Sequence, residues 1–315
     1  MLTELAIVIP AYKSNFLETA LDSIVAQTNH NFIVYVSDDG SREDLLAIVN
    51  LYKYKLNIEY YRFPDNLGRK DLVGHWNRSV RLSAEKWVWL FSDDDVLSPG
   101  CVEAFYRELE ATGAAYNLYR FNIEMIDSIG ATICIKQPHP VLESAYGFLT
   151  GRLQSRSLSA AVEYIFRKEV FDKYQGFVNF PSAYCADDAS WLIFADDQLI
   201  FTIQAEKVYW RASGINISAG KTRAFPKAQA LLQFIAFVTE KFSTQRSELL
   251  AMAYPWFFEN LLYIQGRLSV LQSVQLSRKF CRIMGGREMD VFKKIFALQY
   301  RYTRFASFLQ KWSGY

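Results

Sequence analysis

The sequence predicts an α/β fold, in which helices cover both faces of a mainly parallel, Rossmann-like sheet, followed by an α-helical C-terminal region. Short apolar runs alternate with stretches of helical periodicity over the first hundred residues, as in strand–helix–strand units. Beyond residue 224 only the helical pattern remains. The chain has 315 residues, of which 51% are hydrophobic and 16% aromatic, so it can bury a large core.

Four short runs rich in β-branched and aromatic residues are the predicted strands, at 5–10, 32–37, 58–63 and 87–91. Between them, apolar residues recur at helical spacing within 16–25, 45–52 and 72–82. Ser41 and Asp44 precede the second helix with a spacing that resembles a capping box. We expect one domain over 1–223, divided near residue 110 into two halves, and a helical region over 224–315.

The cysteines and the first residues indicate the compartment. The four cysteines, at positions 101, 134, 185 and 281, form no CxxC pair, which fits a reducing cytosol better than a zinc or disulfide framework. Glu4 interrupts an apolar run that is too short for a signal peptide. The longest uncharged apolar stretches, 228–239 and 249–258, fall short of the ~20 residues of a spanning helix. We expect a cytoplasmic protein without a transmembrane segment.

Acidic residues follow three of the predicted strands, in SDDGS at 37–41, PDNLGRK at 64–70 and DDD at 93–95. Because the carboxyl ends of parallel strands meet at one edge, these acids should cluster where such sheets bind ligands. Three adjacent carboxylates repel one another, and Mg²⁺ or Mn²⁺ bound with nucleotide phosphates would neutralise them. The alternative is a solvated loop, in which Ser98 caps the next helix and Pro99 occupies its first turn.

The motifs IVIPAYKSNFLETALDSIVAQT, VSDDGS, NLGRK and WVWLFSDDDVLSP together resemble the family-2 glycosyltransferases. The resemblance is close over about residues 5–110 and looser to about residue 220. It implies the GT-A fold, with a nucleotide-binding half over 1–110 and an acceptor half over 111–223. It also implies an inverting hexosyltransferase that uses Mn²⁺ or Mg²⁺ and moves a sugar from a UDP-sugar to an acceptor hydroxyl.

The resemblance implies roles for residues of the first half. Asp39 matches the acid that accepts a hydrogen bond from the uracil ring, and Pro10 and Tyr12 line the base pocket. Asp93 matches the acid at the ribose. The metal ligands would be Asp94, directly, and Asp95, through water. Arg69 stands where the family often has a basic residue near the nucleotide. Asp39 could instead form the turn before Gly40, and Arg69 could be an ordinary surface residue.

In the second half, SAYCADDASWLIFA at 182–195 resembles the acidic pair that begins a helix in the family. Asp188 matches the general base that removes the proton from the acceptor hydroxyl. Candidate diphosphate contacts are Arg211, Lys221 and Arg223, which flank a small and polar run that resembles the family's mobile loop. Asp187 and Asp188 could instead be ordinary acids at a helix N-terminus. Lys221 and Arg223 could belong to a solvated loop of mixed charge.

Three positions depart from the family pattern. Ser92 replaces an acid of the metal motif, Trp76 replaces a common arginine, and Asp187 replaces a glutamate. The metal geometry and the choice of donor are therefore less firmly implied than the fold. A metal-dependent nucleotidyltransferase and a non-catalytic nucleotide-sugar-binding protein remain alternatives. The first should need a basic loop near the first strand, where only Lys13 is present, and the second would not need Asp188.

The C-terminal region is basic. Residues 261–315 carry ten Lys or Arg residues and two acids, although the whole chain has a net charge of only +2. An apolar stripe runs from Val291 to Trp312 with basic residues on other faces. The stripe either packs on protein, including a partner chain in a homodimer, or lies on an anionic membrane, which would suit a lipid-linked saccharide acceptor in bacterial surface polysaccharide synthesis. The absence of a recognisable nucleic-acid-binding motif argues against nucleic acid.

Overall fold

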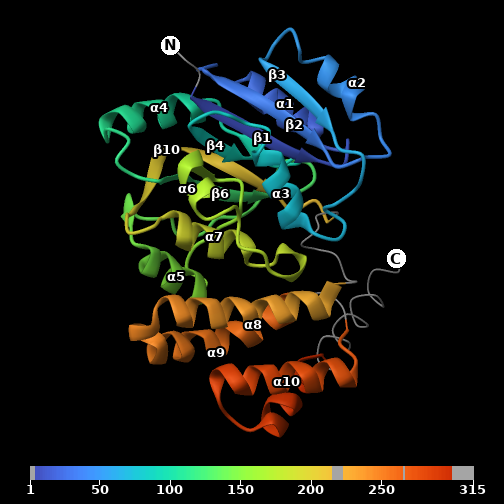
Figure 1. The fold of residues 1–315 in the computed structure, drawn as a ribbon, viewed down its shortest axis with the longest axis vertical. Coiled ribbons are helices and arrows are strands. Elements are labelled where there is room, and N and C mark those ends of the chain that lie inside the picture. The colour runs from blue at the N-terminus through green and yellow to red at the C-terminus, as the bar shows by residue number, and fades with distance from the viewer. Residues whose placement is uncertain (1–3, 215–222, 265–266, 300–315) are drawn as a thin grey trace. The chain divides into compact units, whose positions relative to one another are not determined.

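The computed structural model describes residues 4–214, 223–264 and 267–299 (Figure 1). By its internal contacts the chain forms two compact units. Unit 1 comprises Met1–Asn179 and Ala186–Gly214, and unit 2 comprises Phe180–Cys185 and Ile215–Tyr315. Unit 1 contains the sheet and the acidic motifs, and unit 2 contains the C-terminal helices.

Within the described residues of unit 1, ten strands form one mixed sheet with the main order β3-β2-β1-β4-β9-β6-β10-β5. β7 pairs with β6, and β8 pairs with β10. The strands are β1 (Leu5–Ala11), β2 (Phe32–Asp38), β3 (Ile58–Arg62), β4 (Trp87–Leu90), β5 (Val96–Leu97), β6 (Leu118–Ile126), β7 (Thr132–Cys134), β8 (Leu142–Glu143), β9 (Tyr164–Arg167) and β10 (Ile200–Arg211).

The four predicted strands are β1 to β4, and they pair in parallel. β9 runs antiparallel between β4 and β6, while β6 and β10 are again parallel. The helices of unit 1 are α1 (Leu17–Val25), α2 (Leu45–Asn50), α3 (Leu72–Val80), α4 (Cys101–Ala111), α5 (Ala145–Leu153), α6 (Lys168–Lys173) and α7 (Ala186–Phe194). The predicted α/β fold is confirmed. The sheet is mixed, and its parallel part includes the four predicted strands.

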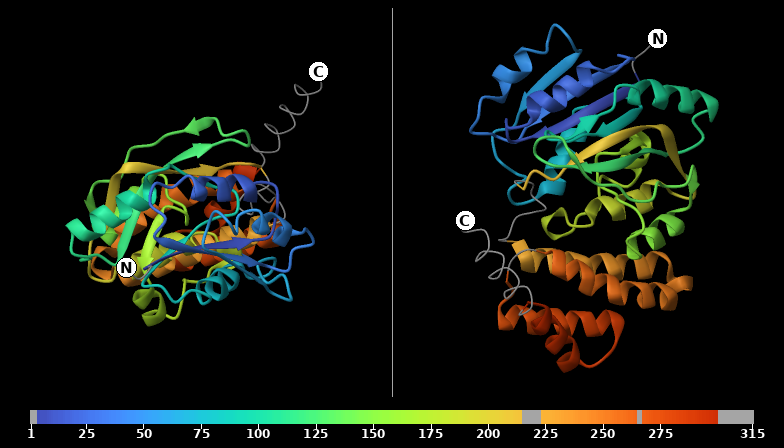
Figure 2. Two further views of the ribbon diagram at one scale, coloured as in Figure 1. Left: turned by 90° about the horizontal axis from the view of Figure 1, so that it is seen from above. Right: turned by 180° about the vertical axis from the view of Figure 1, so that it is seen from behind.

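Side chains of β1 alternate between two buried faces, because successive strand residues point to opposite sides of a sheet. Leu5, Ile7 and Ile9 join a core formed with α1, α2 and α4. Ala6 and Val8 are also fully buried, on the other face, and α3 packs against β1. Figure 2 shows helices on both sides of the sheet. This double burial explains why β1 is a continuous apolar run.

Two predicted helix starts are wrong in detail. α2 begins after Asp44, whose side chain accepts a hydrogen bond from the amide of Ala47, while Ser41 lies outside the helix. α4 begins after Gly100 and has no side-chain cap, so neither Ser98 nor Pro99 has its predicted place. The Ser98 hydroxyl instead donates to Glu206 Oε2 at 2.5 Å. A long-range partner therefore replaces the local one.

Unit 2 consists of helices. They are η1 (Pro181–Ala183), α8 (Ala224–Lys241), η4 (Ser243–Gln245), α9 (Arg246–Tyr263), α10 (Val270–Met284) and a further helical stretch at 288–299. α8 packs against α9, α10 and η1. Among the described residues, no helix has both the length and the apolar character needed to cross a membrane.

The described part of the predicted apolar stripe packs within unit 2. Val291 and Ile295 are buried, and the ammonium group of Lys294 lies 3.9 Å from the ring centre of Phe258 and 4.6 Å from that of Tyr254. The rest of the stripe, to Trp312, lies outside the described residues. Over 288–299 the apolar face therefore packs on protein.

Candidate functional site

Asp93 joins the ends of two neighbouring strands. It lies beyond β4, and its Oδ2 accepts hydrogen bonds from the backbone amides of Tyr12 at 3.0 Å and Lys13 at 3.3 Å, just beyond β1. Burial, with a further contribution from the charge of Asp94, raises the pKa of Asp93 to about 6. The predicted ribose contact thus lies beside the predicted base-pocket residue Tyr12.

Asp94 and Asp95 are bound by Arg211, the last residue of β10, which pairs with β5 directly after the acidic loop. The backbone N–H of Arg211 donates to Asp95 Oδ1 at 2.6 Å, and its Nε donates to the carbonyl oxygen of Asp94 at 2.7 Å. Its Nη1 donates to the carbonyl oxygens of Asp127 and Ser128. The Arg211 side chain is buried, and these bonds attach the end of β10 to the acidic loop.

The donor set of the acidic loop fits a divalent cation that is also bound by phosphate. The Asp94 side chain is partly exposed, and its Oδ1 accepts a hydrogen bond from Ser92 at 2.6 Å. Asp95 is buried and its Oδ2 has no hydrogen-bond partner. No group of three or more metal-binding side chains is found in the described part of the chain. Mg²⁺ usually takes only one or two carboxylates in addition to substrate phosphates, which matches this arrangement.

Burial is the main cause that raises the pKa of all three aspartates. For Asp94 the cation of Arg211 opposes this effect, whereas the pKa of Asp95 is raised well above its usual range, with the charge of Asp94 contributing. Three carboxylates in a dry loop are costly when all are ionised. A cation placed there would remove that repulsion.

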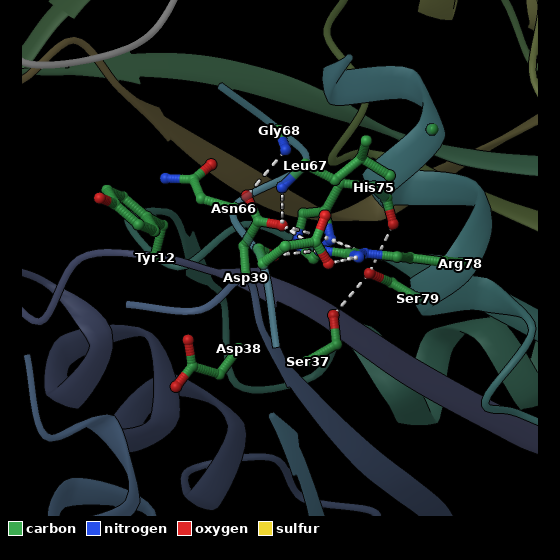
Figure 3. A network of polar contacts seen from close by, with 12 residues as sticks. Tyr12, Ser37, Asp38, Asp39, Asn66, Leu67, Gly68, His75, Arg78 and Ser79 are labelled. Carbon is green, nitrogen blue, oxygen red and sulfur yellow. Dashed lines mark hydrogen bonds and ion pairs between the residues drawn. The ribbon is translucent and has the colours of Figure 1, made fainter. Parts of the chain in front are cut away.

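Asp39 is buried in a polar network at the end of β2 (Figure 3). Its Oδ1 accepts hydrogen bonds from the amide of Leu67 at 3.0 Å and from Arg78 Nη2 at 2.5 Å. Its Oδ2 accepts from the amide of Gly68 at 2.8 Å, which leaves that oxygen with capacity for another donor. Burial raises the pKa of Asp39, and the bonds from Gly68 and Arg78 oppose that rise.

Arg78 was not among the site residues predicted from the sequence, and it lies beside His75. Both lie on α3, where a spacing of three residues puts them on one face. Arg78 lies 3.8 Å from the ring centre of Phe63, and its Nε donates to Nδ1 of His75 at 3.1 Å. Burial lowers the pKa of His75 to about 3, so its ring is neutral. The spacing of the two residues on a predicted helix was the signal available in the sequence.

Tyr12 and two glycines shape the surroundings of Asp39. Figure 3 draws Tyr12 on the opposite side of Asp39 from Arg78, and 37% of the tyrosine is exposed. Gly40 has a φ of +68°, which favours glycine, and a Cβ at Gly68 would lie 2.8 Å from Asp39 Oδ2. Pro10, at the end of β1, is partly buried. The short PDNLGRK loop can therefore approach the carboxylate closely.

The acidic pair predicted at a helix start lies in the first turn of α7. Asp188 is buried and bound by Arg152, with Nε–Oδ1 and Nη2–Oδ2 distances of 3.0 Å. Asp187 is partly exposed, and burial together with the charge of Asp188 raises its pKa to about 7. Glu163 is fully buried, and burial raises its pKa to about 8. Sequence reasoning missed both Arg152 and Glu163.

The remaining candidate cations are Arg69, Lys221 and Arg223. Arg69 is exposed, and its amide donates to Asn66 Oδ1 at 2.9 Å. Arg223 is partly buried in unit 2, at the N-terminus of α8. Lys221 lies outside the described residues. The structure therefore brings Pro10, Tyr12, Asp39 and the DDD loop to one edge of the sheet, and Arg69 follows Gly68 in the loop that bonds Asp39.

Comparisons with known proteins agree with this arrangement. Residues 6–133 match the family described as Glycosyl transferase family 2. A 63-residue segment is 48% identical to the chondroitin synthase of Pasteurella multocida (strain Pm70), covering 19% of this chain and 6% of that protein. Alignments with this relative and four others span 6% to 25% of the relatives' own lengths.

Solved structures share the fold at low sequence identity. S. aureus TarS 1-349 in complex with UDP-GlcNAc has a TM-score of 0.67 and 13% identity, covering 96% of this chain and 92% of that one. The mannosyltransferase PcManGT from Pyrobaculum calidifontis, in complex with GDP-Man and Mn²⁺, has a TM-score of 0.55 and 13% identity, covering 96% and 83%. Residues 6–133 are therefore a glycosyl transferase family 2 region, and the sheet has the GT-A arrangement.

Proposed function

We propose that this protein transfers a sugar from a UDP-sugar to an acceptor hydroxyl, with inversion at the anomeric carbon. The observation that carries the proposal is the hydrogen bonding of Asp93 to the amides of Tyr12 and Lys13, directly after Ala11, whose carbonyl oxygen accepts from the amide of Asp39. It joins the ends of β1 and β4 into one polar edge, where open α/β sheets bind nucleotides. TarS, with a similar fold, has been crystallised with UDP-GlcNAc and with UDP.

In this proposal the nucleotide lies along that edge. Asp39 Oδ2 accepts the N3–H of uracil, Pro10 and Tyr12 line the base pocket, and Asp93 contacts the ribose. Asp94, with Asp95 behind it, would hold Mn²⁺ or Mg²⁺, which would neutralise charge on the departing diphosphate. Arg69, Lys221 and Arg223 remain candidate contacts of the nucleotide or its phosphates.

Asp188 is the proposed general base. It takes the proton of the acceptor hydroxyl while the acceptor oxygen attacks the anomeric carbon and the diphosphate leaves with the bonding electrons. A single displacement with the base opposite the leaving group inverts the anomeric centre. A positioned carboxylate contributes about 10²–10⁴-fold to such a step.

The acceptor in this proposal is a saccharide, free or linked to a lipid, in bacterial surface polysaccharide synthesis at the cytoplasmic side of the membrane. The alignment with a chondroitin synthase supports a saccharide acceptor. The basic composition of residues 261–315 supports contact with an anionic surface. The packing of 288–299 within unit 2 supports the alternative, in which this region stabilises the protein or a homodimer.

The test is calorimetric titration of UDP, in Mn²⁺ and in chelator, followed by incubation with a panel of UDP-sugars and measurement of released UDP. The proposal expects tighter UDP binding with Mn²⁺ and slow hydrolysis of at least one UDP-sugar. Equal affinity in Mn²⁺ and chelator, with no UDP released from any donor, would overturn it. Binding without hydrolysis would favour a non-catalytic nucleotide-sugar-binding protein.

A further inference from the structure

The two carboxylates at the start of α7 occupy different environments. The Asp188 side chain is 4% exposed and is bound by Arg152 through two guanidinium nitrogens. Asp187 is partly exposed, and its carboxylate accepts hydrogen bonds from backbone amides of the helix start. Two adjacent carboxylates do not both ionise readily in a dry site. Something must therefore decide which of them carries the negative charge.

Arg152 is placed to stabilise a negative charge on Asp188. It lies on α5, which packs against α7, and its Nη1 donates to the carbonyl oxygen of Ser157 at 3.2 Å. That bond orients the guanidinium so that its Nε and Nη2 edge faces Asp188. The fork of an arginine matches a carboxylate in a way that a lysine ammonium does not.

The groups that face the pair come from three segments. They are Arg152 from α5, Glu163 just before β9, and the two aspartates of α7 themselves. Glu163 remains protonated near neutral pH, because burial raises its pKa to about 8. The charge of Asp188 contributes to raising the pKa of Asp187 to about 7, whereas Arg152 lowers it. Arg152 therefore supplies the positive charge that faces the two aspartates.

This inference rests on the proposed function. We propose that Arg152 is a positioning residue that fixes the negative charge of the pair on Asp188, so that Asp188 rather than Asp187 receives the proton of the acceptor. The proton passes from the acceptor oxygen to the Asp188 carboxylate as the new glycosidic bond forms and the diphosphate departs. Without Arg152 the Asp188 carboxylate would be buried without its cation, and burial of an unpaired carboxylate favours its protonated form.

The experiment measures UDP release from the UDP-sugar that the wild type hydrolyses, between pH 5.5 and 9, with water in place of the acceptor. Arg152→Gln should lose about 10- to 100-fold in kcat at pH 6.5 and recover most of that loss by pH 9, because a buried carboxylate that has lost its cation is deprotonated only at higher pH. Arg152→Lys keeps the charge and should keep the wild-type pH midpoint with a lower kcat. Arg156→Gln, at an exposed arginine four residues further along, is the matched control and should behave as wild type.

A second variant separates charge placement from packing. In Arg152→Gln/Asp187→Asn the charge of Asp187 no longer opposes ionisation of Asp188, so the pH midpoint should lie below that of Arg152→Gln. A uniform loss at every pH, or a wild-type profile in Arg152→Gln, overturns the inference. If Arg152→Gln does not fold, a shifted pH midpoint in Arg152→Lys overturns it instead.

The same assay tests the proposed function separately. Asp188→Asn should abolish UDP release while UDP still binds. If Asp188→Asn is as active as wild type, or the wild type releases no UDP, then the proposed function fails. If Asp188→Asn is inactive and Arg152→Gln keeps the wild-type profile, only the role of Arg152 fails.

Discussion

Arg211 and Asp95 are 116 residues apart in the chain, yet the backbone N–H of Arg211 donates a 2.6 Å hydrogen bond to Asp95 Oδ1. The same arginine donates from its side chain to the carbonyl oxygen of Asp94. The last residue of β10 thereby fixes both the backbone and one carboxylate of the acidic loop. The conformation of this loop is decided by the second half of the domain.

Replacing Arg211 by glutamine should loosen the loop. The backbone bond to Asp95 would remain, but the carbonyl oxygens of Asp94, Asp127 and Ser128 would lose their guanidinium partner. We expect a loss of about 2–4 kcal/mol in the free energy of unfolding, measured by urea titration, and weaker Mn²⁺-dependent UDP binding. Arg107→Gln, at an exposed position on α4, should change neither. Unchanged stability in Arg211→Gln would show that these bonds are replaced by water.

Removing Arg78 should make UDP binding depend on pH. Burial raises the pKa of Asp39 and Arg78 opposes that rise, so Arg78→Ala should raise the pKa further. If ionised Asp39 accepts the N3–H of uracil, UDP should bind about 10-fold more weakly at pH 6 than at pH 8 in this variant. Calorimetry at both pH values checks this, with Arg107→Ala as control. Equal affinities at the two pH values would argue against a base contact by Asp39.

Asp94→Asn should remove most of the effect of metal on UDP binding. The amide keeps the shape of the side chain but loses the charge that a divalent cation requires. We expect at least a roughly 10-fold loss of the Mn²⁺-dependent affinity, with little change in chelator. Asp172→Asn, at a mostly exposed residue paired with Lys168, is the control. If Asp94→Asn retains the full Mn²⁺ effect, the metal is held elsewhere.

Stability should depend on the buried Glu163. Its pKa is raised from 4.5 in the unfolded chain to about 8 in the folded protein, so between these values the folded state keeps a proton that the unfolded state has released. Stability must therefore fall as pH rises from about 4.5 to about 8.

Glu163→Gln should remove this dependence. The variant should match wild type near pH 4.5 and be more stable by about 3–5 kcal/mol at pH 8, as measured by urea unfolding. Glu169→Gln, at an exposed position, should follow the wild-type curve. Parallel pH curves for Glu163→Gln and wild type would mean that Glu163 is ionised in the folded state.

Local patterns determined the first half of unit 1. Its four parallel strands follow from short apolar runs that are buried on both faces, as for Leu5, Ala6 and Ile7 of β1. The position of each acid at a strand end follows from the same runs, so the clustering of Asp39 and Asp93 at one edge was predictable. The helix starts were less predictable, because the Ser98 hydroxyl could bond either its own helix or the distant Glu206.

The sequence by itself determined the kind of fold, the polar edge and the presence of an acidic pair at the start of α7, because these depend on periodicity and on residues that are neighbours in the chain. Only the tertiary structure decided which cationic side chain pairs with which acid. Arg211 bonds the acidic loop at Asp94 and Asp95, while Arg78 and Arg152 are the partners of Asp39 and Asp188. The energy of a buried ion pair depends on the distance between the charges and on their desolvation, and neither can be read from the sequence alone.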